Sequence, residues 1–141
     1  MSTLIKNASI VNEGIIFTLD VLIEKDKIRE ISENIETKAD ITIDATGKYL
    51  IPGVIDDQVH FREPGLTHKA NIYTESKAAI AGGITSFMEM PNTNPQALTQ
   101  ELLEEKFKIA EGDSLANFTF FMGVSNNNLE EVLKTDPKTV G

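Results

Sequence analysis

The chain has 141 residues, and its 40% of apolar residues is enough for a core of modest size. Acidic residues outnumber basic ones by 22 to 13, so the formal net charge is −9, and a surface of this sign repels nucleic-acid phosphates. There is no cysteine, which excludes disulfides, thiolate zinc sites and cysteine nucleophiles. Histidine, carboxylate and amide groups remain as metal ligands.

The sequence also lacks the signals of export and of membrane insertion. No apolar run approaches the roughly 18 residues of a membrane span. The N-terminal residues MSTLIKN do not resemble a signal peptide. We therefore expect a soluble, cytoplasmic protein that has neither a nucleic acid nor a membrane as partner.

Residues 1–52 have the pattern of short β-strands that are rich in Ile, Val and Thr and are separated by polar turns. The predicted strands are residues 3–11, 15–24, 27–31, 41–44 and 48–51. In the second of them, one face is apolar and the other polar, which predicts one buried and one exposed face. The apolar face holds Phe17, Leu19, Val21 and Ile23, and the polar face holds Thr18, Asp20 and Glu24. These features predict a small β-sandwich segment.

The pattern changes at Pro52-Gly53, where apolar strands begin to alternate with helices, as in parallel β/α units. The predicted strands are residues 54–61, 84–90 and 117–124, and the predicted helices are residues 72–81, 100–111 and a third from Asn128. Gly82-Gly83 and Gly112 are suited to end the first two helices, and Asn128 is suited to cap the third. In the second helix, Leu103, Phe107 and Ala110 share one face. Residues 139–141 resemble the start of another strand.

Length then decides the fold class. A (β/α)8 barrel takes about 250 residues, or roughly 31 for each unit, so residues 53–141 supply about three units. No glycine-rich phosphate loop favours a nucleotide-binding open sheet instead. We predict an α/β chain in which a small β-sandwich segment, residues 1–52, precedes the first three β/α units of a TIM-type (β/α)8 barrel, residues 53–141. The chain resembles the front of a longer, truncated protein.

Four polar side chains follow the period of the strand at residues 54–61. In an ideal strand every second side chain points to the same side. One side therefore holds Asp56, Gln58, His60 and Arg62. They lie toward the carboxyl end, where barrel enzymes keep their sites. The alternative is that these groups only form hydrogen bonds at the end of the strand.

Two stretches, YLIPGVIDDQVHFREPGLTHK and AGGITSFMEMPNTNP, resemble the N-terminal part of dihydroorotases in the cyclic amidohydrolase superfamily. The resemblance implies that Arg62 of HFREPG and Asn92 of MPNTNP bind the substrate carboxylate. Allantoinases usually carry Asn at the Arg position, and hydantoinases lack the pair, so Arg62 with Asn92 favours dihydroorotate. The alternatives are an ion pair between Arg62 and Glu63, and a turn role for Asn92.

The resemblance also implies a zinc site, with one or two ions bound by an HxH motif at the end of the first barrel strand. His60 matches the second histidine, but Gln58 replaces the first, and an amide oxygen is a weaker zinc ligand than imidazole. Asp56 could assist from the same predicted face, whereas Asp57 could do so only if the strand bulges. We expect His68 to be a loop histidine with a local partner.

The family reaction implied by the resemblance is the reversible cyclisation of N-carbamoyl-L-aspartate to dihydroorotate in pyrimidine synthesis. The remaining metal ligands and a proton-shuttling aspartate belong to later strands, so we expect no catalytic residue in this chain and no activity from it alone. We expect the full-length form to be a homo-oligomer. Two alternatives remain: a catalytically silent, partner-binding scaffold, which Gln58 favours, and another cyclic-amide hydrolase such as an allantoinase. Glu89 is interpreted either as a carboxylate that supports the site or as a capping or solvated residue.

Overall fold

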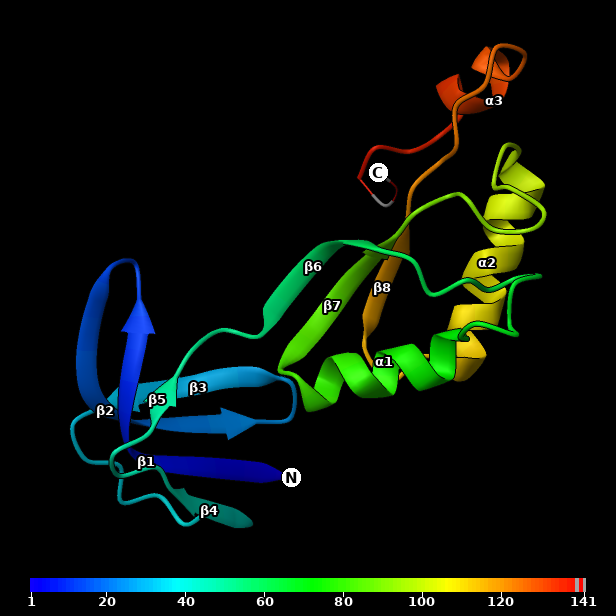
Figure 1. Ribbon diagram of the computed structural model, residues 1–141. Helices are drawn as coiled ribbons and strands as arrows, with labels where there is room; N and C mark the ends of the chain where they lie inside the picture. The colour runs from blue at the N-terminus through cyan, green and yellow to red at the C-terminus, as the bar shows by residue number, and fades with distance from the viewer. Residues whose placement is uncertain (139, 141) are drawn as a thin grey trace. The chain divides into compact units, whose positions relative to one another are not determined.

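The computed structural model describes residues 1–138 and 140, which form two compact units, Met1–Pro52 and Gly53–Gly141. The boundary falls where the sequence pattern changes (Figure 1). Within the described residues, no helix combines the length and apolar character needed to cross a bilayer. The strand start expected at residues 139–141 lies outside the described part, apart from Val140.

The first unit is one five-stranded sheet rather than two packed sheets. Its strands lie close to the predicted runs: β1 (Ser2–Asn12), β2 (Ile15–Glu24), β3 (Lys27–Ser32), β4 (Ile41–Asp44) and β5 (Tyr49–Leu50). The order is β3-β2-β1-β4, and β5 also pairs with β1. A bulge between Ile5 and Ala8 interrupts β1, so β4 pairs with its first half and β5 with its second. Residues 1–52 therefore do not form the two layers of the predicted sandwich by themselves.

The predicted faces of β2 are partly wrong. Phe17 is 47% exposed, whereas Asp20 is 1% exposed. The Asp20 carboxylate accepts hydrogen bonds from the backbone N–H groups of Asn7, at 2.8 Å, and Ile35, at 3.0 Å. Burial raises the pKa of Asp20, but these two hydrogen bonds and the charge of Lys6 lower it further, so the pKa lies below its usual value. A buried carboxylate is stable here because it satisfies one backbone donor at the bulge and one after β3.

We expect Asp20→Asn to lower the free energy of unfolding of the first unit by about 1–3 kcal/mol at pH 7, because one buried N–H loses its acceptor. The pKa of Asp20 is lower in the folded state than in the unfolded state. Its contribution to the free energy of unfolding is therefore complete above the pKa of an ordinary carboxyl group and is lost as the pH falls through the folded-state pKa. The difference from wild type should therefore shrink at pH 3. Urea unfolding followed by NMR checks this, with exposed Asp26→Asn as the control. An equal loss at both pH values would contradict the expectation.

The second unit contains three β/α units, as predicted. The strands β6 (Val54–Val59), β7 (Ile84–Glu89) and β8 (Asn117–Phe120) are parallel and lie in this order. The helices are α1 (Ile72–Ala81), α2 (Gln100–Asp113) and α3 (Leu129–Leu133). Figure 1 shows α1 and α2 on one side of the sheet. The core between these helices and the sheet contains Ile72, Phe87, Leu103, Ala110 and Phe120. Parallel strands bring their carboxyl ends to one edge, where the loops after β6, β7 and β8 meet.

The glycine predicted to end α1 is correct, whereas the roles predicted for Gly112 and Asn128 are not. Gly83, with φ of +87°, supplies the left-handed residue after α1. Gly112 does not end α2, because the helix continues to Asp113 and Ser114 N donates to Ala110 O. Asn128 precedes α3, but its side chain does not cap the helix.

The Asn128 side chain is buried and fully hydrogen-bonded. Its Nδ2 donates to Leu98 O at 2.9 Å and to Gly123 O at 2.8 Å, and its Oδ1 accepts from Ser125 N at 2.7 Å. Buried loop carbonyls need donors, and this requirement decides the orientation of the amide. Asn128 therefore joins the loops that follow β7 and β8.

Candidate functional site

β6 has an irregularity in its pairing with β7 that changes which side chains share a face. Asp56 and Val59, three positions apart, pair with β7 residues that are only two positions apart. One extra residue reverses the alternation of side chains along a strand. Val59 packs against the core beneath the helices, so Asp56 lies on that side, and Gln58 and His60 lie on the other. The prediction that Asp56 shares their face is wrong. Asp56 Oδ1 instead accepts from Gln58 N at 3.2 Å.

The structure brings together His60, just after β6, and Asn92, just after β7. His60 Nδ1 lies 2.9 Å from Asn92 Oδ1, and both residues are exposed. Because an amide oxygen can only accept, His60 Nδ1 carries the proton, and in the neutral ring Nε2 keeps its lone pair. Asn92 is therefore more than a turn residue. This hydrogen bond leaves His60 Nε2 as an acceptor and Asn92 Nδ2 as a donor.

Arg62 has a constrained backbone, and its side chain has no ion-pair partner in the described part of the chain. Its φ of +72° lies in the left-handed region, which is uncommon for a residue with a side chain. Its N–H donates to Glu89 Oε1 at 3.0 Å. Within residues 1–138 and 140, no carboxylate forms an ion pair with the Arg62 guanidinium, and Glu63 Oε2 accepts from Ile72 N at 2.9 Å instead. The alternative of an Arg62–Glu63 ion pair is thus not what the structure shows.

Glu89, at the end of β7, is buried against Lys106 of α2. Both side chains are 1% exposed, and Lys106 Nζ lies 3.0 Å from Glu89 Oε2. Burial raises the pKa of Glu89 and lowers that of Lys106, and the opposite charge of the partner opposes each shift. Glu89 is therefore neither a solvated nor a helix-capping residue.

Sequence reasoning missed Lys106, although the sequence does carry a signal for it. Lys106 follows Leu103 by three positions and precedes Ala110 by four, so it falls within the apolar stripe of α2. A lysine in an apolar stripe requires a buried partner, because an unpaired charge there is very costly. The acidic residue at the end of the neighbouring strand, Glu89, is that partner.

The loops after β6 and β7 also contact each other through their backbones. Asn94 N donates to Pro64 O at 3.1 Å. Gly65 has φ of +79°, and a Cβ built on it would lie 1.8 Å from Asn94 O. Thr93, which is buried, donates from Oγ1 to Pro95 O at 2.9 Å. These direct contacts hold the loops after β6 and β7 in shape.

The described residues of this chain offer one zinc ligand but not the complete ligand set of a zinc site. Among residues 1–138 and 140, no three histidine or acidic side chains cluster as metal ligands would. His60 Nε2 has the free lone pair that zinc needs, and Gln58 is an exposed amide on the same side. His68 is exposed in the loop before α1, and no hydrogen bond of its ring is found within the described part of the chain.

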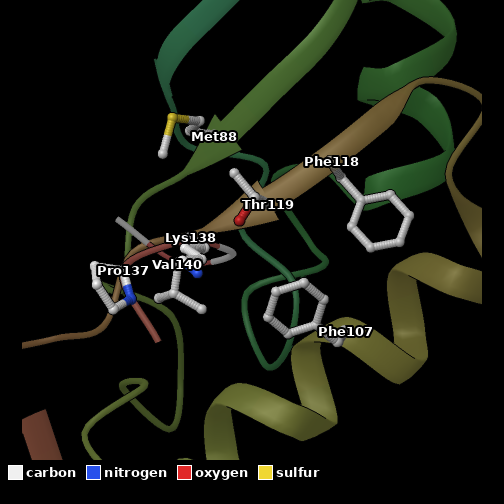
Figure 2. Close-up of a pocket in the computed structure, with 7 residues that line it drawn as sticks. All are labelled: Met88, Phe107, Phe118, Thr119, Pro137, Lys138 and Val140. Carbon is white, nitrogen blue, oxygen red and sulfur yellow. The ribbon is translucent and has the colours of Figure 1, made fainter. Parts of the chain in front are cut away.

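Two pockets lie near the strand ends. A pocket of about 190 Å³ is lined by Pro91, Asn92, Gln96, Leu98, Gly123 and Val124, so it adjoins one residue of the predicted site. A second, of about 420 Å³, lies beside β8. Figure 2 shows its lining, with Phe118 facing Phe107 of α2. None of the predicted site residues lines this second pocket.

Comparisons with known proteins show the family of this chain. A family model described as "Dihydro-orotase-like" matches residues 47–133. A dihydroorotase of Carboxydothermus hydrogenoformans is 52% identical over 97 residues, which cover 67% of this chain and 23% of that protein. An allantoinase of Deinococcus radiodurans is 41% identical over 107 residues, which cover 75% of this chain and 25% of that protein.

Solved structures give the same result. The L-hydantoinase (dihydropyrimidinase) from Arthrobacter aurescens superposes with a TM-score of 0.90 at 34% identity, covering 94% of this chain and 30% of that one. The chain thus spans less than a third of the length of the proteins that it matches.

We expect Gly65→Ala to separate the two loops, because its Cβ would collide with the Asn94 carbonyl. Gly83→Ala is the matched control, since Gly83 has a similar φ of +87° but no atom within 4 Å of the added Cβ. The control should cost about 1 kcal/mol of stability, and Gly65→Ala roughly 1–3 kcal/mol more. Urea unfolding and the exchange rate of the Asn94 amide measure the difference. Equal costs and an unchanged Asn94 amide would show that the loops are not held by this contact.

Proposed function

This chain belongs to the dihydro-orotase-like family, and we propose that it forms the front part of a dihydroorotase. The complete protein would catalyse the reversible cyclisation of N-carbamoyl-L-aspartate to dihydroorotate, in the cytoplasm and within pyrimidine synthesis. One observation carries the proposal: the Arg62 guanidinium, which has no ion-pair partner among residues 1–138 and 140, and an oriented amide, Asn92, follow two adjacent strands whose loops are joined. We also propose that the full-length protein is a homo-oligomer.

The two side chains suit a carboxylate on a small cyclic amide. Arg62 offers a planar, permanently charged fork that binds both oxygens of a carboxylate. Asn92 adds a neutral donor, because His60 already occupies its Oδ1 and leaves Nδ2 for the ligand. A site of this kind favours rings that carry a carboxylate over uncharged rings. The sequence resemblance implies that hydantoinases lack the Arg–Asn pair. The preference for a ring with a carboxylate therefore favours a dihydroorotase over a hydantoinase.

His60 is the residue of this chain that would hold zinc, through Nε2. When bound, zinc polarises the reacting carbonyl and lowers the pKa of water toward neutrality. The hydrogen bond to Asn92 fixes the His60 tautomer and the orientation of its ring. His60 therefore connects the metal position to the substrate anchor. The remaining ligands and the proton-transferring group would come from parts of the full-length protein outside residues 1–141.

The second candidate function is a catalytically silent scaffold, which the neutral Gln58 favours, because an amide oxygen is a weaker zinc ligand than imidazole. The zinc content of the full-length protein separates the two. A dihydroorotase should bind zinc, and Gln58→His should strengthen that binding because imidazole is the better ligand. Atomic-emission analysis of the purified proteins measures this. A native protein without zinc or ring-closing activity would favour the scaffold.

We expect Arg62→Gln and Asn92→Ala, in the full-length protein, each to reduce kcat/KM for dihydroorotate by about 10- to 100-fold, because each removes a hydrogen bond to a charged group. Lys69→Gln is the matched control: it removes a positive charge from the same exposed loop and should leave kcat/KM unchanged. Steady-state kinetics with dihydroorotate and allantoin provide the measurement. Wild-type preference for allantoin would instead support the allantoinase alternative.

A further inference from the structure

We propose that Glu89 and Lys106 are positioning residues that hold Arg62 and Asn92 at the separation needed to bind a substrate carboxylate. This inference rests on the proposed function, because it concerns the same anion site. Neither side chain touches the proposed ligand groups, and both lie beneath the loops.

Burying an ion pair in a core carries a large desolvation free energy. Both charges are removed from water, with side chains 1% exposed, and Lys106 Nζ lies 4.8 Å from the centre of the Phe120 ring. Apolar side chains of similar volume would often stabilise such a site as well or better. The pair therefore calls for a role other than stability, and the groups that it contacts indicate that role.

On one side, Glu89 Oε1 accepts the Arg62 N–H at 3.0 Å. Arg62 is held there in a left-handed backbone conformation, with φ of +72°. Residues with a Cβ avoid this region unless their surroundings compensate. The buried carboxyl group accepts from this N–H, so it fixes where the Arg62 side chain leaves the backbone.

On the other side, Lys106 Nζ donates to Met90 O at 3.0 Å. Met90 precedes Asn92 by two residues, and its own N–H donates to Val59 O at 3.0 Å. The same ammonium therefore forms an ion pair with Glu89, which holds Arg62, and donates a hydrogen bond to the backbone that leads to Asn92. One buried pair thus links both halves of the proposed anion site.

A separate contact keeps the loops together if the pair is removed. Asn94 N still donates to Pro64 O, and Gly65 still packs against Asn94. Loss of the pair should therefore shift Arg62 and Asn92 relative to each other without opening the loops. A small displacement of this kind is enough to weaken the binding of one carboxylate by both Arg62 and Asn92.

Two double variants of the full-length protein test the proposal. Glu89→Leu with Lys106→Met replaces the pair by apolar groups and removes both hydrogen bonds. Glu89→Gln with Lys106→Met also removes both charges but keeps an oxygen that can accept from Arg62 N. We expect the first variant to raise KM for dihydroorotate by about 10- to 100-fold with a smaller change in kcat. The second variant should recover part of this loss.

Two further readouts separate positioning from a general structural role. Binding of dihydrouracil, the same ring without the carboxylate, should be unchanged in both variants. Exchange of the Arg62 amide, followed by NMR, should accelerate in the apolar variant and much less in the glutamine variant. A folded apolar variant with unchanged KM and unchanged Arg62 exchange would overturn the proposal, as would equal weakening of both ligands.

The outcomes also distinguish this inference from the proposed function. Wild-type protein that neither binds nor converts dihydroorotate would refute the proposed function. If the Arg62 amide still responded to the two variants as expected, Glu89 and Lys106 would remain positioning residues for the two loops. If it did not respond, the positioning role would be refuted as well.

Discussion

The junction between the loops that follow β6 and β7 is the constraint on which the site depends. Three parallel strands bring their carboxyl ends to one edge, but this alone does not fix the side chains beyond that edge. The loops are fixed by backbone contact between Pro64, Gly65 and Asn94, and by a buried ion pair beneath them. These contacts replace the solvation that polar loop groups would otherwise require. The exposed residues His60 and Asn92 and the half-buried Arg62 thereby acquire a defined arrangement.

Most of the architecture was predictable because it follows from periodic patterns. Alternating apolar residues located the strands, and the helical stripe of Leu103 and Ala110 located α2. The errors occur where a contact with another segment overrides the local period. Asp20 is buried because Asn7 and Ile35 present N–H groups to it, and neither is near Asp20 in the sequence. The extra residue in β6 depends on its pairing with β7, so the sequence of β6 alone did not reveal it.

The candidate site was only partly visible in the sequence. Motif spacing indicated His60 and Asn92 as residues that follow adjacent strands, and the structure brings these two together, but the spacing also placed Asp56 with them. The hydrogen bond between His60 and Asn92 depends on how two loops meet, and no pattern within either loop predicts it. Lys106 is different, because a lysine within an apolar stripe signals a buried partner. The supporting residues of a site can thus be sought where a charge interrupts a hydrophobic period.

The most direct test of the anion site is a crystal structure of the full-length protein with zinc and dihydroorotate bound. We predict that the substrate carboxylate lies within hydrogen-bonding distance of the Arg62 guanidinium and of Asn92 Nδ2, with His60 Nε2 coordinating the metal. A carboxylate held by other residues, with Arg62 and Asn92 facing solvent, would contradict the proposed function of this chain.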